Sequence, residues 1–222
     1  MGAIAGALLA LTGSALGLSA LAAWVGERRA LRSFLAGAVP GGRIRSREDL
    51  LALRRAVRAR IRFDTERVDE RRPLLRHTAR HILEEGWGFC GENARVSVLL
   101  LLAGGVRAHR LYLFGPRWGH VVVAHPWDGA WRVFDAHDDA RTCPPDDAVG
   151  RLEAADLASY PNAVADNPWR AAAWAKAVRR FPALARAHPP RALALLAESP
   201  DLIRALVCFG VAAAGIAAML LL

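Results

Sequence analysis

Residues 86–105 read GWGFCGENARVSVLLLLAGG, and this stretch decides the fold that we predict. The apolar run after Asn93 is long enough for a mostly buried helix, and the pair Gly104-Gly105 is a typical helix end. Cys90 therefore falls at the N-terminal end of the predicted helix. Because the positive end of a helix dipole favours the thiolate form of a thiol placed there, Cys90 is a candidate nucleophile.

Three strand-like segments follow this helix. They cover 106–114, 118–125 and 130–135, and they are rich in Val, Tyr, Trp and Phe. The turn signals GPRW and PWDGA separate them, so the sequence predicts an antiparallel meander.

Two of these strands carry the partners that a reactive thiol needs. His120 lies in WGHVVVAH, and Asp135 lies in WRVFDAHDD on the next strand. Residues on one face of neighbouring antiparallel strands come within a few ångströms, so Asp135 can hold one ring nitrogen of His120 while the other faces Cys90. The sequence thus predicts a Cys-His-Asp relay.

The order of GFCGENARV, LLLLAGGVRAHRLYLFG, GHVVV and WRVFD resembles the core of the transglutaminase-like superfamily of cysteine enzymes, over about residues 84–140. The resemblance implies a papain-like α+β fold, with Cys90 as nucleophile, His120 as base and Asp135 as orienting acid. It also implies attack on an amide or ester carbonyl through a thioester, without a cofactor. The chain departs from the family at Ala124-His125, where an acidic residue is frequent, and at Ala136, where a proline is frequent.

Other site predictions are less specific. Trp87 and Gly91 are the candidates for contacts to the oxyanion or the substrate. We predict no metal site, because the available side chains lack the spacing of zinc ligands on a helix or knuckle. Those side chains are Cys90, His109, His120, His125 and His137.

The two chain ends predict membrane helices. Residues 3–25 and 205–222 contain no charged side chain, and about 20 apolar residues suffice to cross the hydrocarbon core. A cleaved signal peptide is the alternative for the first, but it lacks a basic n-region and is longer than usual. The spacings Gly2-x-x-x-Gly6 and Gly13-x-x-x-Gly17 fit close approach of another helix, from this chain or from a second copy in a homo-oligomer.

Charge and cysteine content suggest the location of the middle of the chain. The net charge is +9, and residues 28–80 hold sixteen arginines against six acids. Basic residues flank the inner ends of both apolar segments, so we predict a two-pass protein of a bacterial inner membrane with a cytoplasmic catalytic domain. Three cysteines without CxxC spacing also fit a reducing compartment.

The predicted organisation has five parts. These are a transmembrane helix (3–25), a helical Arg-rich region (26–83), the transglutaminase-like core (84–140), a helical extension (141–201) and a second transmembrane helix (205–222). Within them, Ser46 and Asp49 resemble a capping box, and Pro73 suits the first turn of another helix.

The predicted function is a membrane-anchored cysteine enzyme that acts on a peptide or protein substrate as a protease, amidase or acyltransferase. We expect membrane lipids as partners and no nucleic acid, because arginines beside an anionic leaflet account for the basic charge. Two alternatives remain open: an inactive peptide-binding scaffold at the membrane, and an Arg-rich binder of nucleic acid or lipid surfaces.

Overall fold

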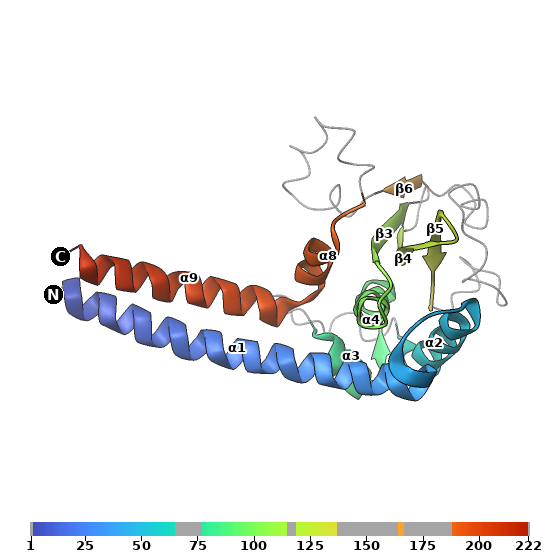
Figure 1. Cartoon of the computed structure of the whole chain (residues 1–222), viewed down its shortest axis with the longest axis horizontal. Coiled ribbons are helices and arrows are strands. Elements are labelled where there is room, and N and C mark those ends of the chain that lie inside the picture. Colours follow the sequence, from blue (N-terminus) through green and yellow to red (C-terminus); the bar gives the residue numbers. More distant parts are fainter. Residues whose placement is uncertain (1, 65–76, 115–118, 137–163, 167–187, 222) are drawn as a thin grey trace.

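The computed structural model describes residues 2–64, 77–114, 119–136, 164–166 and 188–221. It has two parts: a rod of two long helices, and a head made of an antiparallel sheet with helices around it (Figure 1). Both chain termini lie at the far end of the rod, so its two helices run antiparallel.

The rod consists of α1 (Gly2–Ala38) and α9 (Pro200–Leu220), and both are long and apolar enough to cross a membrane by length and composition. The predicted segment 3–25 lies within α1, and the predicted segment 205–222 extends past the end of α9 at Leu220. The helix α1 continues beyond Val25 to Ala38 because no helix breaker occurs before Pro40. Its last turns bury Leu31 and Leu35 in the head. One unbroken helix therefore joins the rod to the head.

Small residues allow the two rod helices to approach closely. A Cβ atom added to Gly13 would lie 2.8 Å from the backbone nitrogen of Ala212, and one added to Gly6 would lie 2.9 Å from the carbonyl oxygen of Gly215. Gly17 packs against the ring of Phe209 in the same way. The close partner of α1 is therefore α9 of the same chain, whereas Gly2 is exposed.

The head contains a four-stranded antiparallel sheet in the order β5-β4-β3-β6. The predicted meander is confirmed as β3 (His109–Phe114), β4 (Gly119–Trp127) and β5 (Ala130–Phe134). The first strand begins later than predicted, because the N–H of Val106 donates to Leu101 O and closes the preceding helix, with Gly105 at φ +93°. The edge strand β6 (Val164–Asp166) pairs with β3 and was not predicted.

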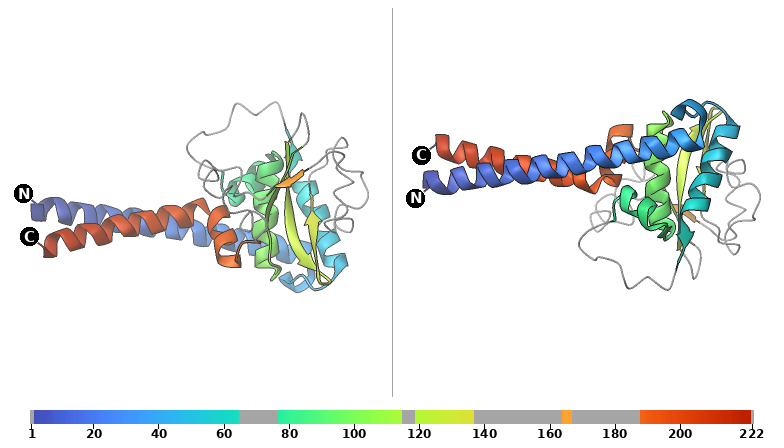
Figure 2. Two further views of the ribbon diagram at one scale, coloured as in Figure 1. Left: turned by 90° about the horizontal axis from the view of Figure 1, so that it is seen from above. Right: turned by 90° about the horizontal axis from the view of Figure 1, so that it is seen from below.

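Helices cover both faces of this sheet. The helix α4 (Cys90–Ala103) lies on one side and α2 (Arg47–Arg60) on the other, as both views in Figure 2 show. Every residue of α4 from Asn93 to Leu102 is buried, which explains why the helix is apolar on all sides from Val98 to Leu102. The predicted α+β core, with a Cys90-bearing helix packed on an antiparallel sheet and a long apolar helix at each chain end, is confirmed.

Local signals in the Arg-rich region are confirmed in part. Ser46 and Asp49 form the predicted capping box of α2, with Asp49 N–H donating to Ser46 Oγ at 3.1 Å. The helix α3 (Ala79–Glu85) is capped by Thr78, whose hydroxyl accepts a hydrogen bond from the N–H of His81 at 3.3 Å. Pro73 lies outside the described residues. The parallel strands β1 (Arg62–Phe63) and β2 (Trp87–Gly88) were not predicted.

The C-terminal part of the head is described only in pieces. The helix α8 (Arg191–Glu198) is one of the short helices expected before the second apolar segment, and it packs on α4 and β3. Residues 137–163 and 167–187 lie outside the described part of the chain.

Two buried histidines lie in the sheet. His109 contacts the C-terminal part of the chain, and His125 lies in the interior of the head. His109 Nε2 lies 2.8 Å from His188 Nδ1, and the ring of His188 stacks on Trp131 at 3.5 Å between centroids. Burial lowers the pKa of His109 to about 4, and burial likewise lowers the pKa of His125, which is fully enclosed, to about 4. Both side chains are therefore neutral at pH 7.

We expect the head to lose stability as the pH falls from about 6.5 toward 4. In this range His109 and His125 bind protons in the unfolded chain but stay neutral in the folded protein. Stability is complete above this window. The slope is up to about 1.4 kcal/mol per pH unit for each histidine. Unfolding of the full chain in detergent, followed by near-ultraviolet circular dichroism between pH 7.5 and 5, measures it. The variant His125→Leu should show a shallower slope than the variant of exposed His81, His81→Gln; equal slopes would contradict the assignment.

Candidate active site

Cys90 is the first residue of α4, as the sequence predicts, and a local network fixes this helix start. The Glu92 carboxylate accepts a hydrogen bond from the N–H of Phe89 at 3.0 Å through Oε2. Its other oxygen lies 3.0 Å from His77 Nδ1. Glu92 therefore caps the helix one residue before the thiol and ties that cap to the segment ahead of α3.

A narrow hollow brings Cys90 together with the sheet. One face of α4, beginning at Cys90, forms one wall of it. The strand β4 and the end of β5 form the opposite wall. Asp135 is one of its lining residues. Its walls consist of Cys90, Asn93, Ala94, Ser97, Val121, Val122, Val123, Phe134, Asp135 and Ala136. The tertiary structure thus places two of the three predicted catalytic residues around one space, with the thiol partly exposed.

Asp135 follows β5 directly and is 2% exposed. Its backbone carbonyl accepts a hydrogen bond at 2.7 Å from Nε of Arg54, which reaches over from α2 and is itself buried. This contact fixes the backbone of a residue that lines the hollow. Arg54 was not predicted to be part of the site, although it shares a helical face with Leu50, Leu53 and Val57, and that spacing indicates that it points inward.

The backbone register relates His120 to Asp135. His120 pairs with Leu113 of β3, and Val123 pairs with Phe134 of β5. Continuing that register by one residue sets Asp135 opposite Val122, two positions along β4 from His120. Diagonal neighbours of this kind are about 7–8 Å apart in antiparallel sheets, within reach of long side chains. The side chain of His120 lies outside the described part of the structure.

The two candidates for oxyanion or substrate contacts lie on either side of Cys90. Trp87 is buried in β2 and packs edge-on against His77 at 6.0 Å and Phe89 at 6.3 Å between centroids. Gly91 is in the first turn of α4, where N–H groups lack a partner within the helix. A side chain there would come within 3.5 Å of Arg110 Nη1. Their roles stay predictions.

An ion-pair network behind the site was not predicted. The Glu198 carboxylate of α8 accepts hydrogen bonds from Arg110 Nη2 at 2.6 Å and from Arg95 Nε at 3.4 Å. One carboxylate therefore joins α8 to β3 and α4. Arg95 also donates to the carbonyl oxygen of His77. Glu198 is far from Cys90 in the chain, and no local pattern marks it as buried.

The histidines outside the relay take structural positions where they are described. His109 pairs with His188, and His125 is enclosed beside Trp127. Among the described residues, no group of three His, Cys, Asp or Glu side chains could hold a metal ion. His137 lies outside those residues.

Comparisons with known proteins give similarities of fold. No protein-family model matches the sequence, and none of the curated proteins compared is similar to it. A structure described as "Crystal structure of a TGase" matches 50% of this chain and 31% of its own chain, with 11% identity and a TM-score of 0.41. A structure described as "a Putative Cysteine Protease from Cytophaga hutchinsonii" matches 62% of this chain and 46% of its own, with 15% identity and a TM-score of 0.40.

This chain spans less than half the length of either matched chain. The two similarities concern the arrangement of helices and strands alone.

Proposed function

We propose that the protein is a membrane-anchored, transglutaminase-like cysteine enzyme that acts on amide bonds of a peptide or protein through a Cys90 thioester. The observation that supports this most directly is the shared hollow: Cys90 at a helix start and Asp135 after β5 line one space, and β4 runs beside it from His120 onward.

The proposed reaction begins with transfer of the Cys90 proton to His120. The thiolate sulfur attacks the substrate carbonyl carbon and forms a C–S bond, and N–H groups at the helix start stabilise the oxyanion. The C–N bond then breaks, and the His120 imidazolium gives its proton to the leaving amine. The products of this half-reaction are a free amine and an acyl thioester on Cys90.

The second half-reaction releases the acyl group. His120 takes a proton from water or from a second amine, whose oxygen or nitrogen attacks the thioester carbonyl. The C–S bond breaks and the sulfur leaves as a thiolate. His120 remains protonated beside it, as after the first proton transfer. Water gives a hydrolase and an amine gives an acyltransferase, and the shape of the surrounding groove selects between them. Asp135 orients the imidazole and stabilises its charged form.

The rod supports a membrane location for this chemistry. Its two helices are apolar on their outer surfaces, and the basic residues follow directly where α1 leaves the apolar stretch. By the tendency of Arg and Lys to stay in the cytoplasm, the head would lie at the cytoplasmic face of a bacterial inner membrane with both termini outside. A substrate would then be a peptide or protein segment at that membrane surface.

Alkylation of Cys90 tests the proposal without knowledge of the substrate. In a Cys143→Ser/Cys208→Ser background, iodoacetamide should modify Cys90 at pH 6 at least about tenfold faster than free cysteine, whose thiol of pKa about 8.5 is only about 0.3% ionised there. His120→Ala should remove most of this advantage, because the imidazolium that stabilises the thiolate is gone. Intact mass at timed intervals gives the rates.

The matched control is His81→Gln, which removes an exposed histidine of α3 and should leave the rate unchanged. If the alkylation rate of Cys90 rises only above pH 8 and is unchanged by His120→Ala, the enzyme proposal is contradicted. That result would favour the inactive peptide-binding scaffold.

A further inference from the structure

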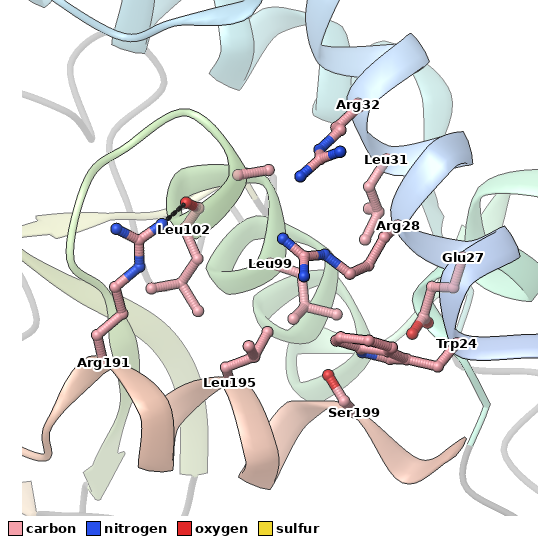
Figure 3. Close-up of a pocket in the computed structure, with 11 residues that line it drawn as sticks. Trp24, Glu27, Arg28, Leu31, Arg32, Leu99, Leu102, Arg191, Leu195 and Ser199 are labelled. Atoms are coloured by element: carbon pink, nitrogen blue, oxygen red, sulfur yellow. Dashed lines mark hydrogen bonds between the residues drawn. The ribbon is translucent and has the colours of Figure 1, made fainter. Parts of the chain in front are cut away.

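A second hollow lies where the rod meets the head. It is bounded by α1, α4, α8 and the residue between α8 and α9, and it encloses about 440 Å³ of empty space including its opening (Figure 3). Trp24 lines it at the end of the uncharged stretch of α1, and Ser199 lines it directly before α9. The hollow therefore sits at the level where both apolar helices leave the membrane.

Three arginines converge on this space. Arg28 and Arg32 extend from α1, and Arg191 extends from α8 (Figure 3). Among the described residues, no carboxylate forms an ion pair with any of the three. Burial lowers the pKa of Arg28, and the nearby positive charges of Arg32 and Arg191 lower it further. Three like charges held together in this way favour an anion between them.

The acidic residue in the wall does not neutralise this cluster. Glu27 is 2% exposed, and its Oε1 accepts a hydrogen bond at 2.6 Å from the N–H of Ala79, at the start of α3. Burial raises the pKa of Glu27, and this one carboxyl group faces three guanidinium groups. The guanidinium groups therefore face the hollow as an excess of positive charge.

Two buried donors also lack partners at this site. Trp24 Nε1 and Ser199 Oγ are enclosed and have no hydrogen-bond partner among the described residues, and both line the same hollow. Ser199 is 0% exposed. A buried donor left unpaired costs free energy of about 1–3 kcal/mol, so both donors would stabilise a hydrogen-bond acceptor bound in the hollow. Oxygen atoms of a phosphate group could accept from both.

The remaining wall is apolar and continues onto the rod. Leu31, Leu99 and Leu195 line the hollow, and the ring of Trp24 carries the Arg28 guanidinium at 5.0 Å from its centroid. Beyond it, the outer surface of the rod exposes large apolar side chains along both helices. These include Leu8, Leu11, Leu16, Leu18, Leu206 and Val207. A ligand with an anionic head and long apolar chains fits this arrangement from end to end.

We propose that this hollow binds the headgroup phosphate of an anionic phospholipid. The guanidinium groups of Arg28, Arg32 and Arg191 hold the phosphate oxygens, the hydroxyl of Ser199 and the indole N–H of Trp24 donate to them, and the acyl chains lie along the rod. Arg191 also donates to Leu102 O at 2.7 Å, which fixes its guanidinium against α4. The bound lipid would thus join α1, α4 and α8, the elements that connect the membrane to the head.

Native mass spectrometry of the full chain in detergent tests this proposal directly. We expect phosphatidylglycerol to bind at least about tenfold more tightly than phosphatidylcholine, and Arg28→Gln/Arg32→Gln to weaken phosphatidylglycerol binding at least about tenfold, since two charge contacts are lost. Ser199→Ala, which removes one donor and no charge, should weaken it less. Thermal unfolding of each lipid-free variant shows whether it is folded.

The matched control is Arg29→Gln/Arg43→Gln, which removes two exposed arginines that do not line the hollow. If this control weakens binding as much, the attraction is a general surface effect and the proposal is wrong. Equal binding of phosphatidylcholine, or displacement of the lipid by a moderate excess of inorganic phosphate, would also overturn it. These measurements do not involve Cys90, so they stand or fall independently of the proposed enzymatic activity.

Discussion

Cys90→Ala should abolish turnover of any amide substrate of this protein, and Asp135→Asn should reduce kcat on the order of 10³- to 10⁴-fold, because the amide no longer orients the His120 ring or stabilises its charged form. The substitution of Asp135 is a sharp test. Its backbone carbonyl, which accepts from Arg54 at 2.7 Å, stays in place when only the carboxylate is changed. A library of fluorogenic peptide amides presented to the full chain in detergent provides the measurement.

The control for these variants changes a side chain outside the hollow. His81→Gln replaces an exposed residue of α3 that does not line the hollow, so it should leave kcat within about threefold. An Asp135→Asn variant that folds and turns over at the wild-type rate would remove Asp135 from the mechanism. Residual turnover in Cys90→Ala would show that the reaction does not need a Cys90 thioester.

Glu198→Ala should lower the free energy of unfolding by about 3–5 kcal/mol, because it leaves the buried guanidinium of Arg95 and the half-buried guanidinium of Arg110 without their shared carboxylate. Glu198 is 5% exposed, and Arg110 approaches it with Nε at 2.5 Å and Nη2 at 2.6 Å. Loss of this contact should loosen α8 from α4 and β3. Denaturant unfolding of the full chain in detergent, followed by near-ultraviolet circular dichroism, gives the change.

An exposed ion pair of similar geometry serves as the comparison. Glu84 and Arg80 of α3 lie 2.7 Å apart with about half of each side chain exposed. Glu84→Ala should change stability far less, because water and salt screen exposed charges. Equal effects of the two substitutions would show that burial adds nothing to the Glu198 contacts.

The elements predicted correctly share a local cause. The capping box at Ser46, the helix that starts at Cys90 and the three-stranded meander all follow from residues within one turn or one strand of each other. The uncharged chain ends predict long helices by composition alone, and α1 and α9 match them. Differences appear at the borders, where α1 continues past Val25 and β3 begins after Val106.

The features that the prediction missed depend on contacts between distant segments. The strand β6 has three residues, too few for a period to show, and it forms because β3 offers an open edge. Arg54 and Glu198 are charged residues in a chain rich in arginine, so their identity alone indicates exposure. Only packing of α2 and α8 against the sheet shows that both are buried.

The order of chemical groups along the chain, the start of the Cys90 helix and the two apolar ends were determined by the sequence itself, because hydrophobic periodicity and helix capping act over a few residues. The tertiary structure decided which groups meet. It set Asp135 beside Cys90, used Arg54 and Glu198 as buried braces, and gathered three arginines where α1 leaves its apolar stretch. These meetings arise from burial of apolar surface between segments far apart in the chain, and no short window of sequence records that.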